Sequence, residues 1–161
     1  MAPRIVVCAE LGAFSLKDPI VAHLKACGYD PVDISLREDG SDRIYYEIGE
    51  VVGKAISAGE YDYGIIFCGS GMGVAMVANR FEGVYAACTE SLQTTIMARG
   101  INNANVLALG VRLIAPQLGC DMAEAFVKSE FLKDAPADIS KEILGACFEE
   151  VKKIDHAAHN P

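Results

Sequence analysis

The order of apolar segments along the chain is the strongest constraint on its fold. Short runs rich in β-branched residues alternate with segments whose apolar residues recur at helical spacing. The expected strands are 4–9, 29–34, 63–68, 84–88 and 105–109, and the expected helices are 16–27, 45–58, 74–79, 92–99, 116–128 and 139–153. Strands and helices in alternation predict an α/β fold, with five parallel strands covered by helices on both faces.

Length and charge favour one globular domain. The 161 residues, 52% of them hydrophobic, are enough for one core and too apolar for a disordered chain. A net charge of −8 disfavours nucleic acid and anionic membrane surfaces as partners. No apolar run approaches the roughly 20 residues that cross a bilayer, and the N-terminal segment does not fit a signal peptide. We expect a single cytoplasmic domain over 1–161, with a tail at 154–161 that frays from His156 onward.

The six cysteines are widely scattered. They form no C-x-x-C pair and no Cys/His cluster of zinc type, so the sequence predicts no metal site. Reduced thiols in a cytoplasmic protein are the expected state. The cysteines are Cys8, Cys27, Cys68, Cys88, Cys120 and Cys147.

A glycine-rich loop follows the third expected strand. Cys68-Gly-Ser-Gly-Met-Gly73 joins an apolar run directly to a helix. Its alternating glycines allow backbone N–H groups to face one concavity, and ligands of open parallel sheets bind beyond the carboxyl ends of the strands. We expect the loop to hold a phosphate, or an oxygen that becomes negative during a reaction. A tight turn that needs glycine only for packing is the alternative.

This segment fits two familiar phosphate-binding motifs poorly. A Walker A loop ends in Gly-Lys-Ser/Thr, whereas Gly73 is followed by Val74. In a dinucleotide fingerprint the third glycine comes later, although Glu90 lies near the position of its acidic residue. A flavodoxin-like or nucleotide-binding module remains the alternative from another class, and a bound nucleotide or a yellow chromophore would identify it.

Cys68 is the candidate for the chemical step. Backbone amides and the nearby helix start are expected to lower its pKa below about 8.5 and favour the thiolate. None of the three histidines, His23, His156 and His159, falls in a loop expected to face a ligand. Nucleophilic Cys–His catalysis is therefore disfavoured. A base beside a cradle of N–H groups is suited to removing a proton next to a carbonyl and stabilising the oxyanion that forms.

Two segments carry a family resemblance. They read Ile65-Ile-Phe-Cys-Gly-Ser-Gly-Met-Gly-Val-Ala-Met-Val-Ala-Asn79 and Ala98-Arg-Gly-Ile-Asn-Asn-Ala-Asn-Val-Leu-Ala-Leu-Gly-Val-Arg112. Together they resemble the ribose-5-phosphate isomerase B and galactose-6-phosphate isomerase family, with similarity from about Arg4 to about Val127. The resemblance implies a Rossmann-like three-layer α/β/α subunit, no metal or organic cofactor, and a homodimer or homotetramer with active sites between subunits. It also implies interconversion of an aldose and a ketose, usually phosphorylated.

The resemblance further implies roles for single residues. Cys68 corresponds to the base that acts through a cis-enediol or enediolate, the 69–73 loop to the anion hole, and Ser70 to a group that assists proton movement. Some members instead place a Glu at the position of Val74, so this chain resembles the cysteine type. The expected substrate contacts are Glu10, Leu11, Tyr45, Gly69, Gly71, Met72, Gly73, Ile101, Asn102, Arg112 and Lys141, with Asn102 on the sugar and Arg112 on the phosphate.

The chain also departs from the family pattern. An Asp-His pair is replaced by Glu10-Leu11, and a second histidine by Ile101. These family histidines are associated with substrate recognition and opening of the sugar ring. Lys141 and Arg43 are the candidates to replace C-terminal arginines that hold phosphate. We expect a small sugar phosphate, either a pentose phosphate or another sugar of four to six carbons, that is short or differently configured and largely open-chain. An unphosphorylated sugar and a non-catalytic sugar-phosphate-binding protein are the alternatives.

Overall fold

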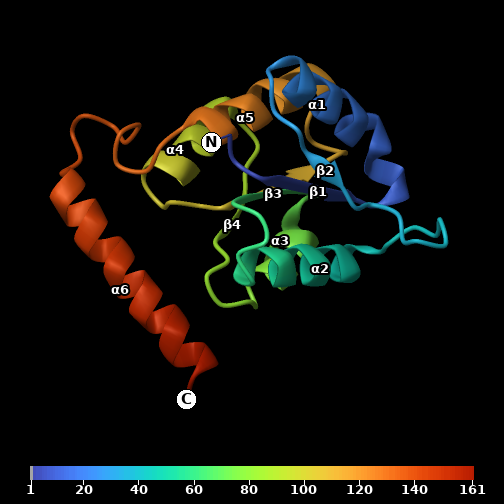
Figure 1. The fold of residues 1–161 in the computed structure, drawn as a ribbon. Helices are drawn as coiled ribbons and strands as arrows, with labels where there is room; N and C mark the ends of the chain where they lie inside the picture. The colour runs from blue at the N-terminus through green and yellow to red at the C-terminus, as the bar shows by residue number, and fades with distance from the viewer. Residues whose placement is uncertain (1) are drawn as a thin grey trace.

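The five strands form one sheet in which all neighbours run parallel (Figure 1). The computed structural model describes residues 2–161. The strands are β1 (Ile5–Ala9), β2 (Val32–Asp33), β3 (Tyr63–Cys68), β4 (Ala86–Cys88) and β5 (Val106–Gly110), in the spatial order β2-β1-β3-β5-β4. The α/β fold with five parallel strands, expected from the sequence, is confirmed.

The two edge strands are shorter than expected. All residues of β1 and β5 are buried, and β3 pairs with both of them. At the edge, β2 begins at Val32 rather than at 29. Pro31 has no N–H for the ladder, and the N–H of Tyr29 instead donates to the carbonyl of Leu24 at 3.0 Å. On the other edge, β4 begins at Ala86 rather than at 84.

Two layers of helices cover the sheet. On one face lie α1 (Phe14–Ala26), α4 (Leu92–Gly100) and α5 (Pro116–Lys128), and on the other lie α2 (Tyr45–Ser57) and α3 (Met72–Ala78) (Figure 1). Successive side chains of a strand point to opposite faces. Accordingly, Ile5 and Val7 pack in the first core, and Val6 and Cys8 pack in the second. The three-layer α/β/α sandwich is confirmed.

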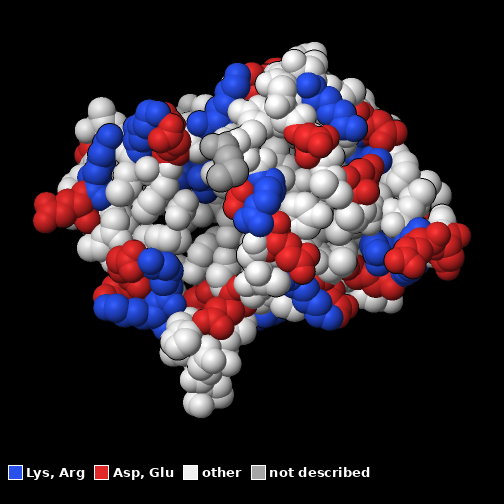
Figure 2. Space-filling model, in the orientation of Figure 1, with Lys and Arg blue, Asp and Glu red and all other residues white. Residues whose placement is uncertain are grey.

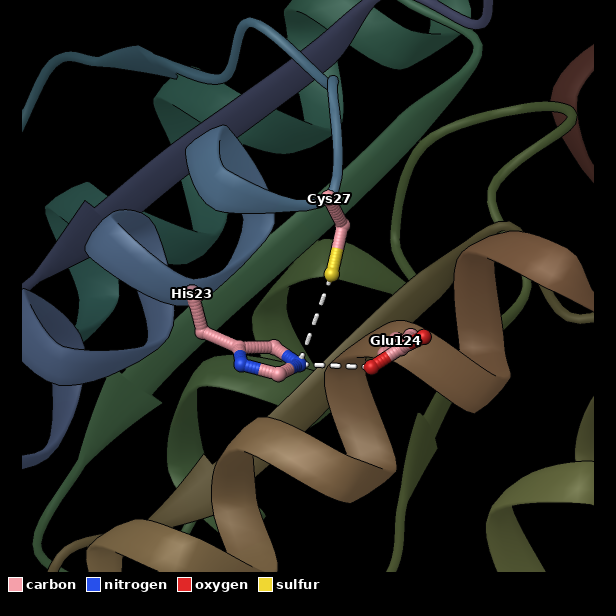
Figure 3. Close-up of side chains that lie close together, drawn as sticks. All are labelled: His23, Cys27 and Glu124. Atoms are coloured by element: carbon pink, nitrogen blue, oxygen red, sulfur yellow. Dashed lines mark hydrogen bonds and ion pairs between the residues drawn. The ribbon is translucent and has the colours of Figure 1, made fainter.

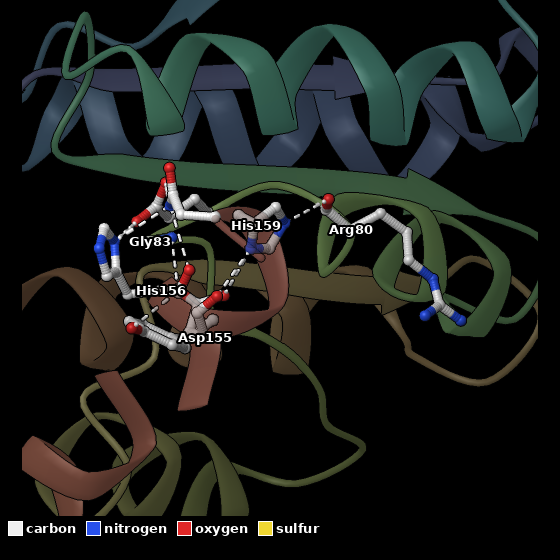
Figure 4. A network of polar contacts seen from close by, with 8 residues as sticks. Arg80, Gly83, Asp155, His156 and His159 are labelled. Carbon is white, nitrogen blue, oxygen red and sulfur yellow. Dashed lines mark hydrogen bonds and ion pairs between the residues drawn. The ribbon is translucent and has the colours of Figure 1, made fainter. Parts of the chain in front are cut away.

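The last helix, α6 (Lys141–His159), corrects the expected boundaries of 139–153 and the expected tail at 154–161. It continues to His159 because tertiary contacts hold its end (Figure 4). The carboxylate of Asp155 accepts from the N–H of Gly83 at 2.7 Å and from the hydroxyl of Tyr85 at 3.2 Å. The Nε2 atom of His159 lies 2.9 Å from the carbonyl oxygen of Arg80. A frayed helix end lacks such contacts with the rest of the protein, so these hydrogen bonds explain why the helix continues.

α6 stands apart from the three layers (Figure 1). None of its residues is buried, and Ile143, Val151 and Ile154 are exposed. Besides the polar contacts of its C-terminal end, it packs on the rest of the chain through Phe148, whose ring lies edge-on to that of Tyr85, with centroids 5.2 Å apart.

The surface shows no continuous basic patch on the face seen in Figure 2, where lysines and arginines are interspersed with acidic residues. Within residues 2–161, no helix combines the length and the apolar character that a bilayer crossing requires.

Candidate active site

The carboxyl end of β3 holds the thiol of Cys68. The strand passes through Gly69 to Gly71 directly into α3. The N–H of Gly71 donates to the Sγ atom of Cys68 at 3.1 Å. Cys68 is only 5% exposed in the isolated chain, and it packs on the core formed with α2 and α3. The thiol therefore faces a main-chain amide of the glycine loop.

Gly71 makes this turn sterically possible. Its φ of 78° lies in the left-handed region, and a Cβ atom there would lie 3.0 Å from the sulfur of Cys88. The neighbouring Ser70 is half-buried, and its hydroxyl accepts from the N–H of Met72 at 3.4 Å. The thiol of Cys88 donates to the carbonyl of Ser70 at 3.6 Å. The loop is thus held by the end of β4 as well as by its own turn.

Arg112 lies beside the same loop. Its N–H donates to the carbonyl of Gly69 at 3.1 Å, and a Cβ atom on Gly69 would lie 3.5 Å from its Nε. The side chain is exposed, and among the described residues it makes no ion pair with a carboxylate. An unpaired guanidinium next to a loop of amides is suited to binding the anionic end of a ligand.

Other expected contacts lie on the same edge of the sheet. The ring of Tyr45, at the start of α2, packs so closely on Gly73 that a Cβ atom there would lie 2.8 Å from it. Glu10 follows β1 and donates its N–H to the carbonyl of Phe67 at 3.3 Å, and Leu11 beside it is 59% exposed. A one-turn 3₁₀ helix, Leu11–Ala13, begins there.

Arg43 reaches this edge from the segment before α2. Its Nε donates to the carbonyl of Ile34, just beyond β2, at 3.2 Å. Arg43 is therefore better placed than Lys141 at the end of the sheet that carries the glycine loop. Lys141 is the exposed first residue of α6.

Ile101 and Asn102 lie at the opposite end of the strands from the glycine loop. They follow α4, which returns to the amino ends of the strands, and they line a cavity with Tyr85 and Phe148. The five residues of β5 separate this edge from the glycine loop by roughly 16 Å. Within one chain the structure therefore does not bring Asn102 together with Cys68.

A polar network that the sequence did not single out supports the ends of β1 and β2. The buried Lys17 forms ion pairs with Asp18 and Asp33, and Asp33 accepts from the N–H and the hydroxyl of Ser35. The hydroxyl of Ser35 in turn accepts from the N–H of Ala9 at 3.0 Å. Burial opposes the charge, but the hydrogen bonds from Lys17 and Ser35 hold the pKa of Asp33 below its usual value. The only local sequence signal for this network was the Asp-x-Ser spacing of Asp33 and Ser35 at the end of β2.

Two other thiols near this edge are poor candidates for the base. Burial raises the pKa of Cys8 to about 12. Burial, followed by the proximity of Cys68, also raises the pKa of Cys88. Both are therefore uncharged near neutral pH, whereas a base needs the anionic form.

The fold and this site together define a class of protein: an α/β sandwich with a thiol and an amide loop at the carboxyl edge of a parallel sheet. A model of the ribose/galactose isomerase family matches residues 5–143. The chain belongs to this family and is an aldose–ketose isomerase.

Relatives and solved structures agree with this assignment. A 4-deoxy-4-sulfo-D-erythrose isomerase of Clostridium sp. is 36% identical over 156 residues, which cover 97% of this chain and 98% of the relative. A D-erythrulose-4-phosphate isomerase of Pectobacterium atrosepticum is 35% identical, over 79% of this chain and 84% of the relative. The structure of ribose-5-phosphate isomerase B from Clostridium thermocellum superposes with a TM-score of 0.82 at 28% identity, covering 96% of this chain and 99% of that one.

Proposed function

We propose that the protein interconverts a four-carbon aldose and its ketose, with an anionic group on carbon 4 of the sugar and Cys68 as the base. The observation that carries this proposal is the Cys68 thiol, which accepts a hydrogen bond from Gly71 beside the unpaired guanidinium of Arg112. One end of the site thus has a proton acceptor with an amide donor, and the other has a positive charge.

The reaction follows from the positions of these groups. The thiolate of Cys68 removes the proton from the carbon next to the carbonyl, and the electrons move onto the carbonyl oxygen. Amides of the loop stabilise this oxygen in the resulting cis-enediolate. The hydroxyl of Ser70 moves a proton between the two sugar oxygens. The Cys68 thiol then returns its proton to the neighbouring carbon, so the cycle needs no net donor or acceptor.

None of the expected substrate contacts is a histidine, and this favours an open-chain substrate. Glu10, Leu11 and Ile101 occupy the positions where the family carries Asp and two histidines. A tetrose with phosphate or sulfonate on carbon 4 has no free hydroxyl there to close a furanose ring, so no acid is needed to open it. Ribose 5-phosphate does close such a ring. The two four-carbon relatives support the shorter substrate.

We infer that a second copy of the chain completes the site. Asn102 lies at the far edge of its own sheet, so it reaches the substrate only if it is presented to the Cys68 edge of a neighbouring subunit. The exposed apolar side chains of α6 favour such an assembly, because burying them releases water from apolar surface. A homodimer or homotetramer of single-domain subunits satisfies both observations.

The test is a substrate panel followed by proton NMR in deuterated water. Erythrose 4-phosphate and 4-deoxy-4-sulfo-erythrose are expected to exchange the proton next to the carbonyl and to form the ketose, whereas ribose 5-phosphate reacts far more slowly. Cys68→Ala is expected to lower the rate by about a hundredfold or more. Cys120→Ala is the matched control, because Cys120 is also buried but packs on the other face of the sheet.

Full activity of Cys68→Ala would refute the role of Cys68 as the base. Faster turnover of ribose 5-phosphate than of the tetroses would refute the substrate class. Thermal stabilisation by the tetroses without proton exchange would identify a binding protein instead of an enzyme with this specificity.

A further inference from the structure

Three side chains able to bind a metal meet between α1 and α5 (Figure 3). The Nε2 atom of His23 lies 2.6 Å from a carboxylate oxygen of Glu124 and 3.7 Å from the Sγ atom of Cys27. One donor atom from each side chain lies within 4.8 Å of the other two.

The helices hold these side chains in place. His23 and Cys27 are four residues apart at the end of α1, so they lie one above the other on the same face. Glu124 comes from α5, which packs against α1 through core residues such as Leu16, Ile20 and Met122. His23 and Glu124 are about 30% and 26% exposed, so an ion from solvent can reach them.

We propose that His23, Cys27 and Glu124 bind a divalent cation of the zinc type, with the fourth position open to water. Imidazole nitrogen, thiolate sulfur and carboxylate oxygen are the ligands that zinc takes in proteins. Tetrahedral zinc bonds place a nitrogen and a sulfur ligand roughly 3.6 Å apart, and a nitrogen and an oxygen ligand roughly 3.3 Å apart. The present His23–Cys27 separation of 3.7 Å already fits, and the His23–Glu124 contact must open slightly.

The protonation states change in a balanced way on binding. Glu124 presents one carboxylate oxygen to His23, while its other oxygen pairs with Lys128. His23 binds through Nε2 in the neutral tautomer that carries its proton on Nδ1. The thiol of Cys27 releases one proton to solvent and binds as the thiolate. Lys128, bonded to the other oxygen of Glu124, competes with the cation and moderates its affinity.

The expected role of this site is structural. Cys27 directly follows α1, near the amino ends of the strands, whereas Cys68 lies at the carboxyl end of β3. A cation held by both helices would fix the end of α1 to α5 and stabilise the folded chain, without contacting the substrate.

The probe is cobalt(II), added to the metal-free full-length protein. A cobalt–thiolate bond produces a charge-transfer band in the near ultraviolet, and added zinc abolishes the band by displacing the cobalt. We expect the band in the wild type, its loss in Cys27→Ser, and binding weakened by at least about tenfold in His23→Gln and Glu124→Gln. Zinc is expected to raise the melting temperature of the wild type but not that of Cys27→Ser.

Matched controls are Cys147→Ser and His156→Gln, which alter exposed side chains on α6 and are expected to leave the band unchanged. Absence of the band in the wild type would overturn the proposal. An undiminished band in Cys27→Ser would also overturn it, because another thiol would then bind the metal. Circular dichroism of each variant separates loss of binding from loss of folding.

Discussion

At the scale of single residues, Gly71 is a position where backbone conformation and space both exclude a side chain. Its φ of 78° is costly for any residue with a Cβ atom, and that atom would crowd the sulfur of Cys88 and the backbone of Leu109, each at 3.0 Å. The same amide donates to Cys68. A change at Gly71 therefore affects stability and the candidate base together.

Gly71→Ala is expected to destabilise the protein by about 2–3 kcal/mol and to lower the isomerase rate, because the loop must shift away from β4. Gly59→Ala is the control, since Gly59 has a similar φ of 71° but open space around its Cβ position. That variant is expected to lose only about 1–2 kcal/mol and to keep its activity. Urea unfolding and the proton-exchange assay measure the two effects. Equal losses in both variants would contradict the crowding argument.

Also at the residue scale, the thiols differ in the groups that surround them in the fold. Cys8 and Cys68 both pack in the core under α2 and α3, yet only the thiol of Cys68 accepts from an amide of the glycine loop. The sequence singled out Cys68 through the glycines that follow it. It gave no comparable signal for Cys27, whose partner Glu124 comes from a distant helix.

At the scale of elements, a buried ion pair joins α1 to the end of β2. Lys17 lies in α1 with its side chain 6% exposed, and it pairs with Asp33. The folded-state pKa of Asp33 is lowered, so the carboxylate contributes stability above its unfolded pKa of about 3.9. This contribution is lost as the pH falls through the folded pKa.

Asp33→Asn is therefore expected to be less stable than the wild type at pH 7, with a difference that narrows as the pH falls below about 4. Urea unfolding at pH 7, 5 and 3.5 measures this difference. Asp18→Asn is the control, because Asp18 also pairs with Lys17 but is 64% exposed, and a smaller effect is expected there. A difference between Asp33→Asn and the wild type that does not vary with pH would contradict the assigned role.

α6 shows how tertiary contacts override a local expectation. Its apolar spacing indicated a helix to about residue 153, and nothing local indicated that residues 154–159 would continue it. The contacts of Asp155 and His159 with the segment 80–85 extend it by six residues.

At the scale of the whole molecule, the distance between Asn102 and Cys68 leads to a prediction about how the subunits assemble. If each active site combines the Cys68 edge of one subunit with Asn102 of another, two inactive variants restore one another. In a random dimer of Cys68→Ala and Asn102→Ala chains, half the dimers are mixed and each mixed dimer keeps one intact site of two.

Co-expression of Cys68→Ala and Asn102→Ala is thus expected to recover about a quarter of the wild-type activity, while either variant alone has little. Light scattering after size exclusion measures the oligomer directly. The control is co-expression of Cys68→Ala with Ser70→Ala, which damages the same edge and restores nothing. A monomeric wild type, or no recovery in the first pair, would contradict the shared site.

The sequence by itself determined the three-layer fold, the central strands and the glycine loop with its cysteine. These features depend on local periodicity and on residues adjacent in the chain, which a linear pattern records. Tertiary structure alone decided the separation of Asn102 from Cys68, the length of α6, and the meeting of His23, Cys27 and Glu124. His23 and Glu124 are 101 positions apart, and only the packing of α1 on α5 brings their side chains within bonding distance.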